Sequence, residues 1–133
     1  MRLFRTLTAA ACLALPMAAV AQEAEVGAVL YGDFCAVCHG VDATGDGPMA
    51  EVLRIPPPDL TALAVDGEFP VARVARQVDG RDPILGHGGA MPLFGPWFEG
   101  DGADVAMRAA DGQPVLLPRP MADLIAYLQE IQS

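Results

Sequence analysis

The sequence is poor in basic residues and shows neither internal repeats nor a persistent strand pattern. Its 133 residues include eight Lys and Arg against seventeen Asp and Glu. Because binding to nucleic acid phosphates needs a basic face, this balance argues against nucleic acid as a partner. Apolar and polar residues do not alternate over any long stretch, so an extensive sheet is not expected. The length allows one domain at most.

Long apolar runs are also absent, and the longest uncharged run near the N-terminus belongs to a secretory signal pattern over residues 1–21. Arg2 and Arg5 precede an uncharged run of sixteen residues, which closes on small residues at the −3 and −1 sites. A membrane span needs about 20 apolar residues, so no stable span is expected once the segment is removed. We predict cleavage after Ala21 and a single domain over residues 22–133.

Cleavage would change both the cysteine count and the charge. Cys12 would leave with the signal peptide. Lipid attachment at Cys12 is the alternative, although residues 9–11 lack the usual aliphatic residue. The mature chain would keep six arginines and all seventeen acids, a net charge of −11. This charge favours electrostatic steering toward a partner with a basic face, and the alternative is that the acidity serves solubility alone.

Three amphipathic segments predict helices, over residues 23–36, 70–78 and from Pro120 to the C-terminus. The residues expected on their buried faces are Val26, Val29, Leu30, Phe34, Val71, Val74, Ala75, Val78, Met121, Leu124, Ile125, Leu128 and Ile131. The outward residues of the middle helix are Arg73, Arg76 and Gln77. Twelve prolines and fourteen glycines make the rest loop-rich. We predict an all-α fold of three to four short helices, whose thin core is completed by something other than side chains.

The stretch FCAVCHG places Cys35 and Cys38 about one helical turn apart, with His39 directly after them. Two such thiols can add to the two vinyl groups on one edge of a haem, while the adjacent imidazole points at the iron. A redox disulfide is one alternative, but the βαβ pattern expected around it is absent. A structural zinc site is another, with only His87 available as a fourth ligand. Haem attachment accounts for the histidine and agrees with an exported protein.

With these residues the sequence resembles the class I cytochromes c, in which CAVCHG is the attachment motif. Gly27 and Tyr31 lie where the family places a small residue and an aromatic in its N-terminal helix, and Tyr127 matches the aromatic of the C-terminal helix. The stretches CHGVDATGDGP and IPPPDLT look like a subgroup of bacterial members. The resemblance implies a small cytochrome c fold with crossing terminal helices around one covalent haem c, and a periplasmic location.

By this resemblance Cys35 and Cys38 form the thioethers and His39 is the proximal iron ligand. Ligating histidines usually donate their other N–H to a carbonyl or carboxylate, and the proline cluster 56–58 is the family-like source of such a carbonyl. The residues proposed to hydrogen-bond the haem propionates are Arg76, Arg81 and Trp97. The alternative for them is a packed indole and solvated charges.

The sixth iron ligand is predicted to be Met91, in the stretch GHGGAMPLFG. Gly88 and Gly89 let the backbone approach the porphyrin, and the distance of 52 residues from His39 fits the family's methionine loop. The other methionines of the mature chain are Met49, Met107 and Met121. Met49 is too close to His39 in sequence, and Met121 lies on the buried face of the last helix. His87 is the rival ligand, and a second imidazole would lower the reduction potential.

Residues 99–118 are an insertion relative to the small family pattern and form either a small hairpin or a partner-binding element. The resemblance implies a carrier of single electrons, because a haem with both axial positions filled by protein has no site for a substrate. One alternative is a haem enzyme with a labile sixth ligand, such as a peroxidase or a gas-binding protein. Another is the haem subunit of a larger dehydrogenase or oxidase complex.

Overall fold

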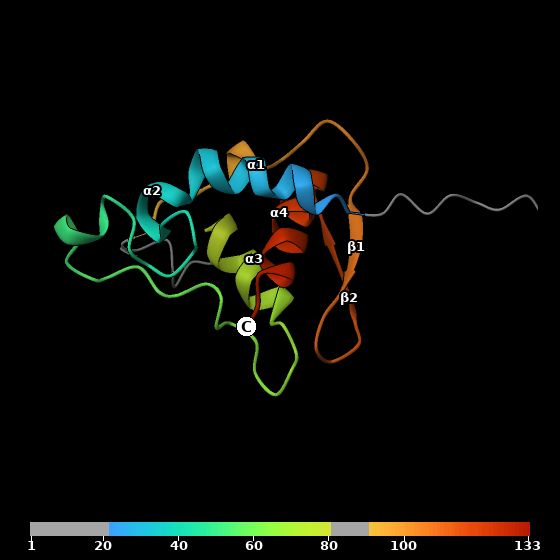
Figure 1. Ribbon diagram of the computed structural model, residues 1–133. Helices are drawn as coiled ribbons and strands as arrows, with labels where there is room; N and C mark the ends of the chain where they lie inside the picture. Colours follow the sequence, from blue (N-terminus) through green and yellow to red (C-terminus); the bar gives the residue numbers. More distant parts are fainter. Residues whose placement is uncertain (1–21, 81–90) are drawn as a thin grey trace, which may run out of the picture.

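The computed structural model describes residues 22–80 and 91–133, and within them it contains four α-helices, two short 3-10 helices and one two-stranded sheet (Figure 1). The elements in chain order are α1 (Ala24–Phe34), α2 (Ala36–His39), η1 (Ala50–Val52), α3 (Val71–Asp79), η2 (Gly95–Trp97), β1 (Val105–Arg108), β2 (Pro114–Leu117) and α4 (Arg119–Glu130). The fold is mostly helical, as predicted. None of the helices in this part of the chain is long and apolar enough to span a membrane.

Helices α1 and α4 lie against each other although they are far apart in sequence (Figure 1). Gly27 lies at the contact, where a β-carbon would overlap the backbone carbonyl of Asp123. One turn later the Tyr31 ring contacts Tyr127, with ring centroids 5.3 Å apart. The absence of a side chain at Gly27 therefore allows the two backbones to approach closely, as the resemblance implied.

The predicted buried face of α1 is confirmed only in part: Leu30 and Phe34 are partly buried against the core, but the valines of the predicted face are exposed. Val26 is 43% exposed and Val29 is 63% exposed, whereas Gly27 and Tyr31 are the buried residues of this helix. The spacing of apolar residues in α1 is compatible with burial of either of two overlapping helix faces. The close approach of α4 selects the face that carries the small residue, because the branched side chains at the flanking positions would hold the backbones apart.

The predicted inward faces of α3 and α4 are confirmed. The buried residues are Val71, Val74, Ala75 and Val78 in α3, and Met121, Ala122, Asp123, Leu124, Ile125 and Leu128 in α4. Ile131 is partly buried against this core. The buried carboxylate of Asp123 accepts a hydrogen bond of 2.8 Å from the backbone N–H of Glu23 and lies 3.8 Å from the Arg119 guanidinium. It thereby ties the start of α1 to α4.

The prediction of an all-α fold is corrected by the β1–β2 hairpin, which is one of the two alternatives given for the insertion 99–118. The strands are antiparallel, with Val105 opposite Leu117 and Met107 opposite Val115. These inward residues alternate with exposed ones over only four residues a strand, which is too short for a strand pattern to stand out. Gly112, with a φ of +80°, forms the turn.

Gly27→Ala is expected to lower the free energy of unfolding of the haem-loaded protein by about 2 kcal/mol or more, as overpacking does where backbone cannot yield. The clashing atoms are the backbone carbonyl of Asp123, so α1 and α4 must separate. Gly32→Ala is the matched control on the same helix, since a β-carbon there meets nothing within 4 Å. It should be neutral or stabilising by up to about 1 kcal/mol. Equal destabilisation of both variants in denaturant unfolding would contradict the tight crossing.

Candidate functional site

The short helix α2 carries Cys35 at its N-cap and Cys38 and His39 in its last turn. A four-residue helix leaves its last carbonyls without partners in the helix. Here the following loop supplies them: Gly45 N–H donates to the His39 carbonyl at 2.8 Å, and Gly47 N–H donates to the Cys38 carbonyl at 3.1 Å. A β-carbon at Gly47 would lie 2.6 Å from that carbonyl, so only glycine permits this approach. The loop therefore fixes the backbone of the CxxCH segment.

A buried hydroxyl fastens the same segment to α1. Tyr31 is 2% exposed, and its O–H donates a hydrogen bond of 2.6 Å to the carbonyl of Gly40, the residue after His39. Burial is the main reason that the pKa of Tyr31 is raised, so the phenol stays protonated and remains a donor. The sequence indicated an aromatic at this position, but not what its hydroxyl does.

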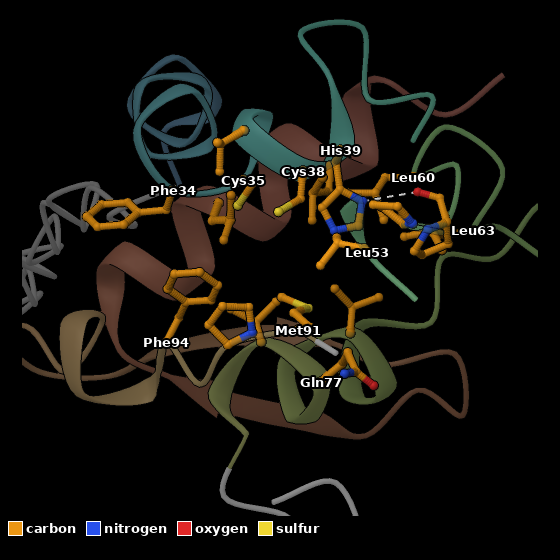
Figure 2. Close-up of a pocket in the computed structure, with 18 of the residues that line it drawn as sticks. Phe34, Cys35, Cys38, His39, Leu53, Leu60, Leu63, Gln77, Met91 and Phe94 are labelled. Atoms are coloured by element: carbon orange, nitrogen blue, oxygen red, sulfur yellow. Dashed lines mark hydrogen bonds between the residues drawn. The ribbon is translucent and has the colours of Figure 1, made fainter. Parts of the chain in front are cut away.

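Beside α2 lies a cavity of about 660 Å³, within the range of about 300–1,000 Å³ that holds small molecules and cofactors. Figure 2 shows Cys35, Cys38 and His39 along one side of the cavity and Met91 and Phe94 along the other. Apolar residues from α3, α4 and the loop before α3 form most of the wall; they are Leu53, Ile55, Pro56, Pro57, Pro58, Leu60, Leu63, Val74, Val78, Leu124 and Leu128. This cavity occupies the place where the sequence predicted a core completed by a cofactor.

The imidazole of His39 is oriented by a backbone carbonyl. Its Nδ1 lies 3.1 Å from the carbonyl oxygen of Pro58 (dashed line in Figure 2), and His39 is 7% exposed. A carbonyl only accepts hydrogen bonds, so in the neutral imidazole Nδ1 carries the proton and Nε2 keeps its lone pair. That nitrogen is the one free to bind a metal. The carbonyl comes from the predicted proline cluster 56–58, and the structure identifies which proline supplies it.

Both cysteines of the motif are free thiols, Cys35 buried and Cys38 half-buried. Burial raises the pKa of the Cys35 thiol to about 12, with a smaller contribution from Cys38. At neutral pH the Cys35 side chain is therefore an uncharged thiol, which suits its position against an apolar wall.

Of the four methionines among the described residues, Met91 alone lines this cavity. Met107 and Met121 are buried in the core, at 6% and 3% exposed, and Met49 is 42% exposed at the surface. The rival ligand His87 and the loop glycines Gly88 and Gly89 lie outside the described residues, and so does Arg81.

The loop that forms one wall is held by the C-terminus. The Gln132 amide nitrogen donates to the carbonyls of Leu60 and Leu128 at 2.7 Å each, and its oxygen accepts from the backbone N–H groups of Leu63 and Ala64 at 2.9 Å each. Three of these bonds connect the residues after α4 to a segment whose leucines line the cavity, and the fourth, to Leu128, returns to α4 itself. No motif in the sequence pointed to Gln132, because its role depends on which backbone groups the fold brings within reach.

Two predicted polar contacts of the cavity are not formed as expected. Arg76 lies on the other side of α3, where it lines a second hollow of about 460 Å³ beside the hairpin, and Trp97 is 66% exposed and does not line the main cavity. Arg73 and Gln77, which were expected to point outward, line the main cavity instead. The amphipathic pattern of α3 correctly predicted its buried apolar residues. It did not predict which of the flanking polar residues line the main cavity.

The donor set fits a haem better than a zinc ion. Two thiols and an imidazole with a free Nε2 share one wall, a thioether faces them, and most of the other lining residues are apolar. Within residues 22–80 and 91–133, no three His, Cys, Asp or Glu side chains cluster as metal ligands would. A four-ligand zinc site would need His87, which lies outside these ranges.

Comparison with protein families gives one match that covers most of the chain. Residues 24–132 match the model of the family described as cytochrome c. No curated protein and no solved structure gives a significant match. The matched range includes α2, the cavity walls, the hairpin and α4.

Proposed function

The chain belongs to the cytochrome c family, and on this basis we propose that it carries single electrons through one haem c held by Cys35, Cys38, His39 and Met91. Membership of this family implies covalently bound haem and haem-based electron transfer. When bound, haem supplies an iron centre that alternates between the ferric and ferrous states. The observation that carries the proposal is the cavity with the two thiols and His39 along one side and Met91 along the other.

Each side chain has a distinct role in this proposal. The thiols of Cys35 and Cys38 would hold the haem covalently, each as a thioether to one of its two vinyl groups. His39 would bind the iron through Nε2, and the Pro58 carbonyl holds the imidazole in orientation. Met91 would hold the iron through its thioether, which favours ferrous iron relative to a second imidazole. With His39 and Met91 both holding the iron, no iron site would be left for a substrate.

The fixed protein groups also serve fast electron transfer. Hydrogen bonds hold the cavity walls in place. They are formed by the loop after α2, which donates to the last carbonyls of that helix, by the Tyr31 hydroxyl and by the Gln132 amide. When the wall keeps its geometry in both oxidation states, the reorganisation energy of electron transfer is small. Apolar lining excludes water from the haem faces.

The test is the intact mass of the protein exported from cells that carry haem-attachment machinery. The expected mass is that of a chain beginning at Gln22 plus one haem, and a redox titration should show a single one-electron couple. A location in the periplasm is part of the proposal and rests on the signal pattern of residues 1–21. A mature chain without added haem would contradict the proposal, and rapid binding of carbon monoxide would favour an enzyme with a labile sixth ligand.

The partners implied by the family are redox proteins, and we expect them to dock through a basic face. The mature net charge of −11 attracts cations over a screening length of about 10 Å at 0.1 M ionic strength. Oxidation of the reduced protein by cationic tris(phenanthroline)cobalt(III) should therefore slow by about tenfold between low and 0.1 M salt. Anionic ferricyanide is the control and should react faster as salt increases. Rates independent of salt with both reagents would leave the acidity as a solubility feature.

A further inference from the structure

Arg73 brings a positive charge to the edge of the haem cavity. Among the described residues it is the only Lys or Arg side chain that lines this cavity. Gln77 lies one helical turn later and also lines it, so the two polar side chains of α3 share the side of the helix that carries Val74 and Val78. Figure 2 draws Gln77 on α3 among the residues that line the cavity. The sequence pattern placed both side chains outside, so this arrangement is a result of the tertiary structure.

Among residues 22–80 and 91–133, neither side chain has a polar partner. No hydrogen bond or ion pair is formed by the Arg73 guanidinium or by the Gln77 amide with a described residue. The chain has seventeen acids, and another arginine, Arg119, lies within 4 Å of two of them, Glu23 and Asp123. A guanidinium that forms no such pair, at the rim of an apolar cavity, is suited to an anionic group of whatever the cavity holds.

We propose that Arg73 pairs with a propionate carboxylate of the haem, with Gln77 as a neighbouring polar group on the same wall. This inference rests on the proposed function. Haem carries two propionate carboxylates on its periphery, and a carboxylate in a largely apolar cavity needs a donor of opposite charge. The other charged or titratable side chains that line the cavity are Asp33 from α1 and the motif residues of α2. Asp33 repels a carboxylate, so Arg73 is the cationic partner that this wall offers.

The proposal assigns Arg73 a positioning and electrostatic role rather than a bond to iron. The guanidinium neutralises a negative charge close to the iron, and less negative charge there stabilises the ferrous state. Its forked N–H groups also match both oxygens of a carboxylate, which the single ammonium of lysine does not. Arg73 should therefore raise the reduction potential and lower the pH at which the propionate ionises.

The experiment compares Arg73→Gln with Arg76→Gln in the haem-loaded protein. Both variants remove one positive charge from the same helix, but Arg76 lines the second hollow and not the haem cavity. Arg73→Gln should lower the reduction potential at neutral pH. The pH range in which the potential falls as the propionate ionises should move upward by about 1 unit, because a nearby opposite charge depresses a carboxyl pKa by at least that much. Arg76→Gln should leave both near the wild-type values.

Arg73→Lys separates pairing from simple proximity of charge. It should restore the potential only in part, because lysine keeps the charge but loses the forked contact. Equal shifts in Arg73→Gln and Arg76→Gln, or full restoration by lysine with an unchanged pH profile, would overturn the proposal. The intact mass of each variant should show one added haem, and this measurement distinguishes failure of the proposed function from failure of the present proposal. A wild type without haem refutes the proposed function. Haem-loaded variants with equal reduction potentials refute only the role of Arg73.

Discussion

Replacing Cys35 and Cys38 together by alanine is expected to remove all covalently attached haem from the exported protein. These are the two thiols beside the cavity, and the described part of the chain contains no other cysteine. The intact mass of the mature chain should then equal that of the polypeptide alone. Haem that survives acid extraction in the double variant would contradict covalent attachment at these residues.

The same variant is expected to lose most of its stability. Unfilled apolar cavities cost up to about 24 cal/mol per Å³, and even a third of that rate over about 660 Å³ amounts to about 5 kcal/mol. That equals the entire stability of a marginal domain, about 5 kcal/mol. Denaturant unfolding should therefore show a weak or absent cooperative transition compared with the haem-loaded wild type.

Cys12→Ala is the matched control for this experiment. Cys12 lies in the segment predicted to be removed, so its replacement should change neither the mass of the mature chain nor its haem content. A mature protein that loses a lipid on this replacement would support the alternative of lipid attachment and would move the mature N-terminus. The haem content should stay at one per chain in either case.

Replacing Met91 by alanine is expected to lower the reduction potential by on the order of a tenth of a volt or more, because axial ligands set haem potentials over a range of about 0.8 V. The thioether favours ferrous iron, and its loss leaves the sixth position to water or an added ligand. The weak charge-transfer band of sulfur-ligated ferric haem should disappear from the spectrum. The reduced variant should bind carbon monoxide, whereas the wild type should bind it poorly.

Two control variants make the assignment of Met91 specific. Met49→Ala removes a methionine that is 42% exposed and does not line the cavity, so the band and the potential should not change. His87→Ala removes the rival ligand and should also leave both nearly unchanged. If His87→Ala erased the wild-type axial ligation and Met91→Ala did not, the haem would be bound by two histidines and the potential would be low.

Bulky residues at Gly88 and Gly89 are expected to weaken the bond of Met91 without affecting haem attachment. The attachment depends on Cys38 in α2 and on Cys35 at the N-cap of that helix, and neither belongs to the methionine loop. Carbon monoxide binding should therefore rise while the added mass of haem stays the same. The two measurements therefore distinguish covalent haem attachment from ligation by Met91.

Much of this protein was determined by local sequence. The motif around Cys35 and Cys38 fixes its own chemistry, because thiols one turn apart and an adjacent imidazole need no distant residue to be recognised. The buried faces of α3 and α4 followed from apolar spacing, since each has one continuous apolar stripe. Family membership was likewise carried by residues close together in the chain, and the family match agrees with it.

The tertiary structure decided those features of the fold in which segments distant in sequence meet. Gly27 and Tyr31, rather than Val26 and Val29, face inward because the backbone of α4 passes within contact distance of that side. The β1–β2 hairpin formed where the sequence left two possibilities, because four-residue strands gain their stability from packing on the helices rather than from their own pattern.

The polar groups of the site show the same division. Pro58 was one of three candidate carbonyls, and only the folded loop brings it to Nδ1 of His39. Gln132 and Arg73 carry no motif, so their positions at the cavity depend on the packing of α4 and α3 against loops far away in sequence. Sequence specified which chemistry the chain carries, because that chemistry resides in adjacent side chains. The fold decided which other groups surround it, because these contacts form only when the helices are packed.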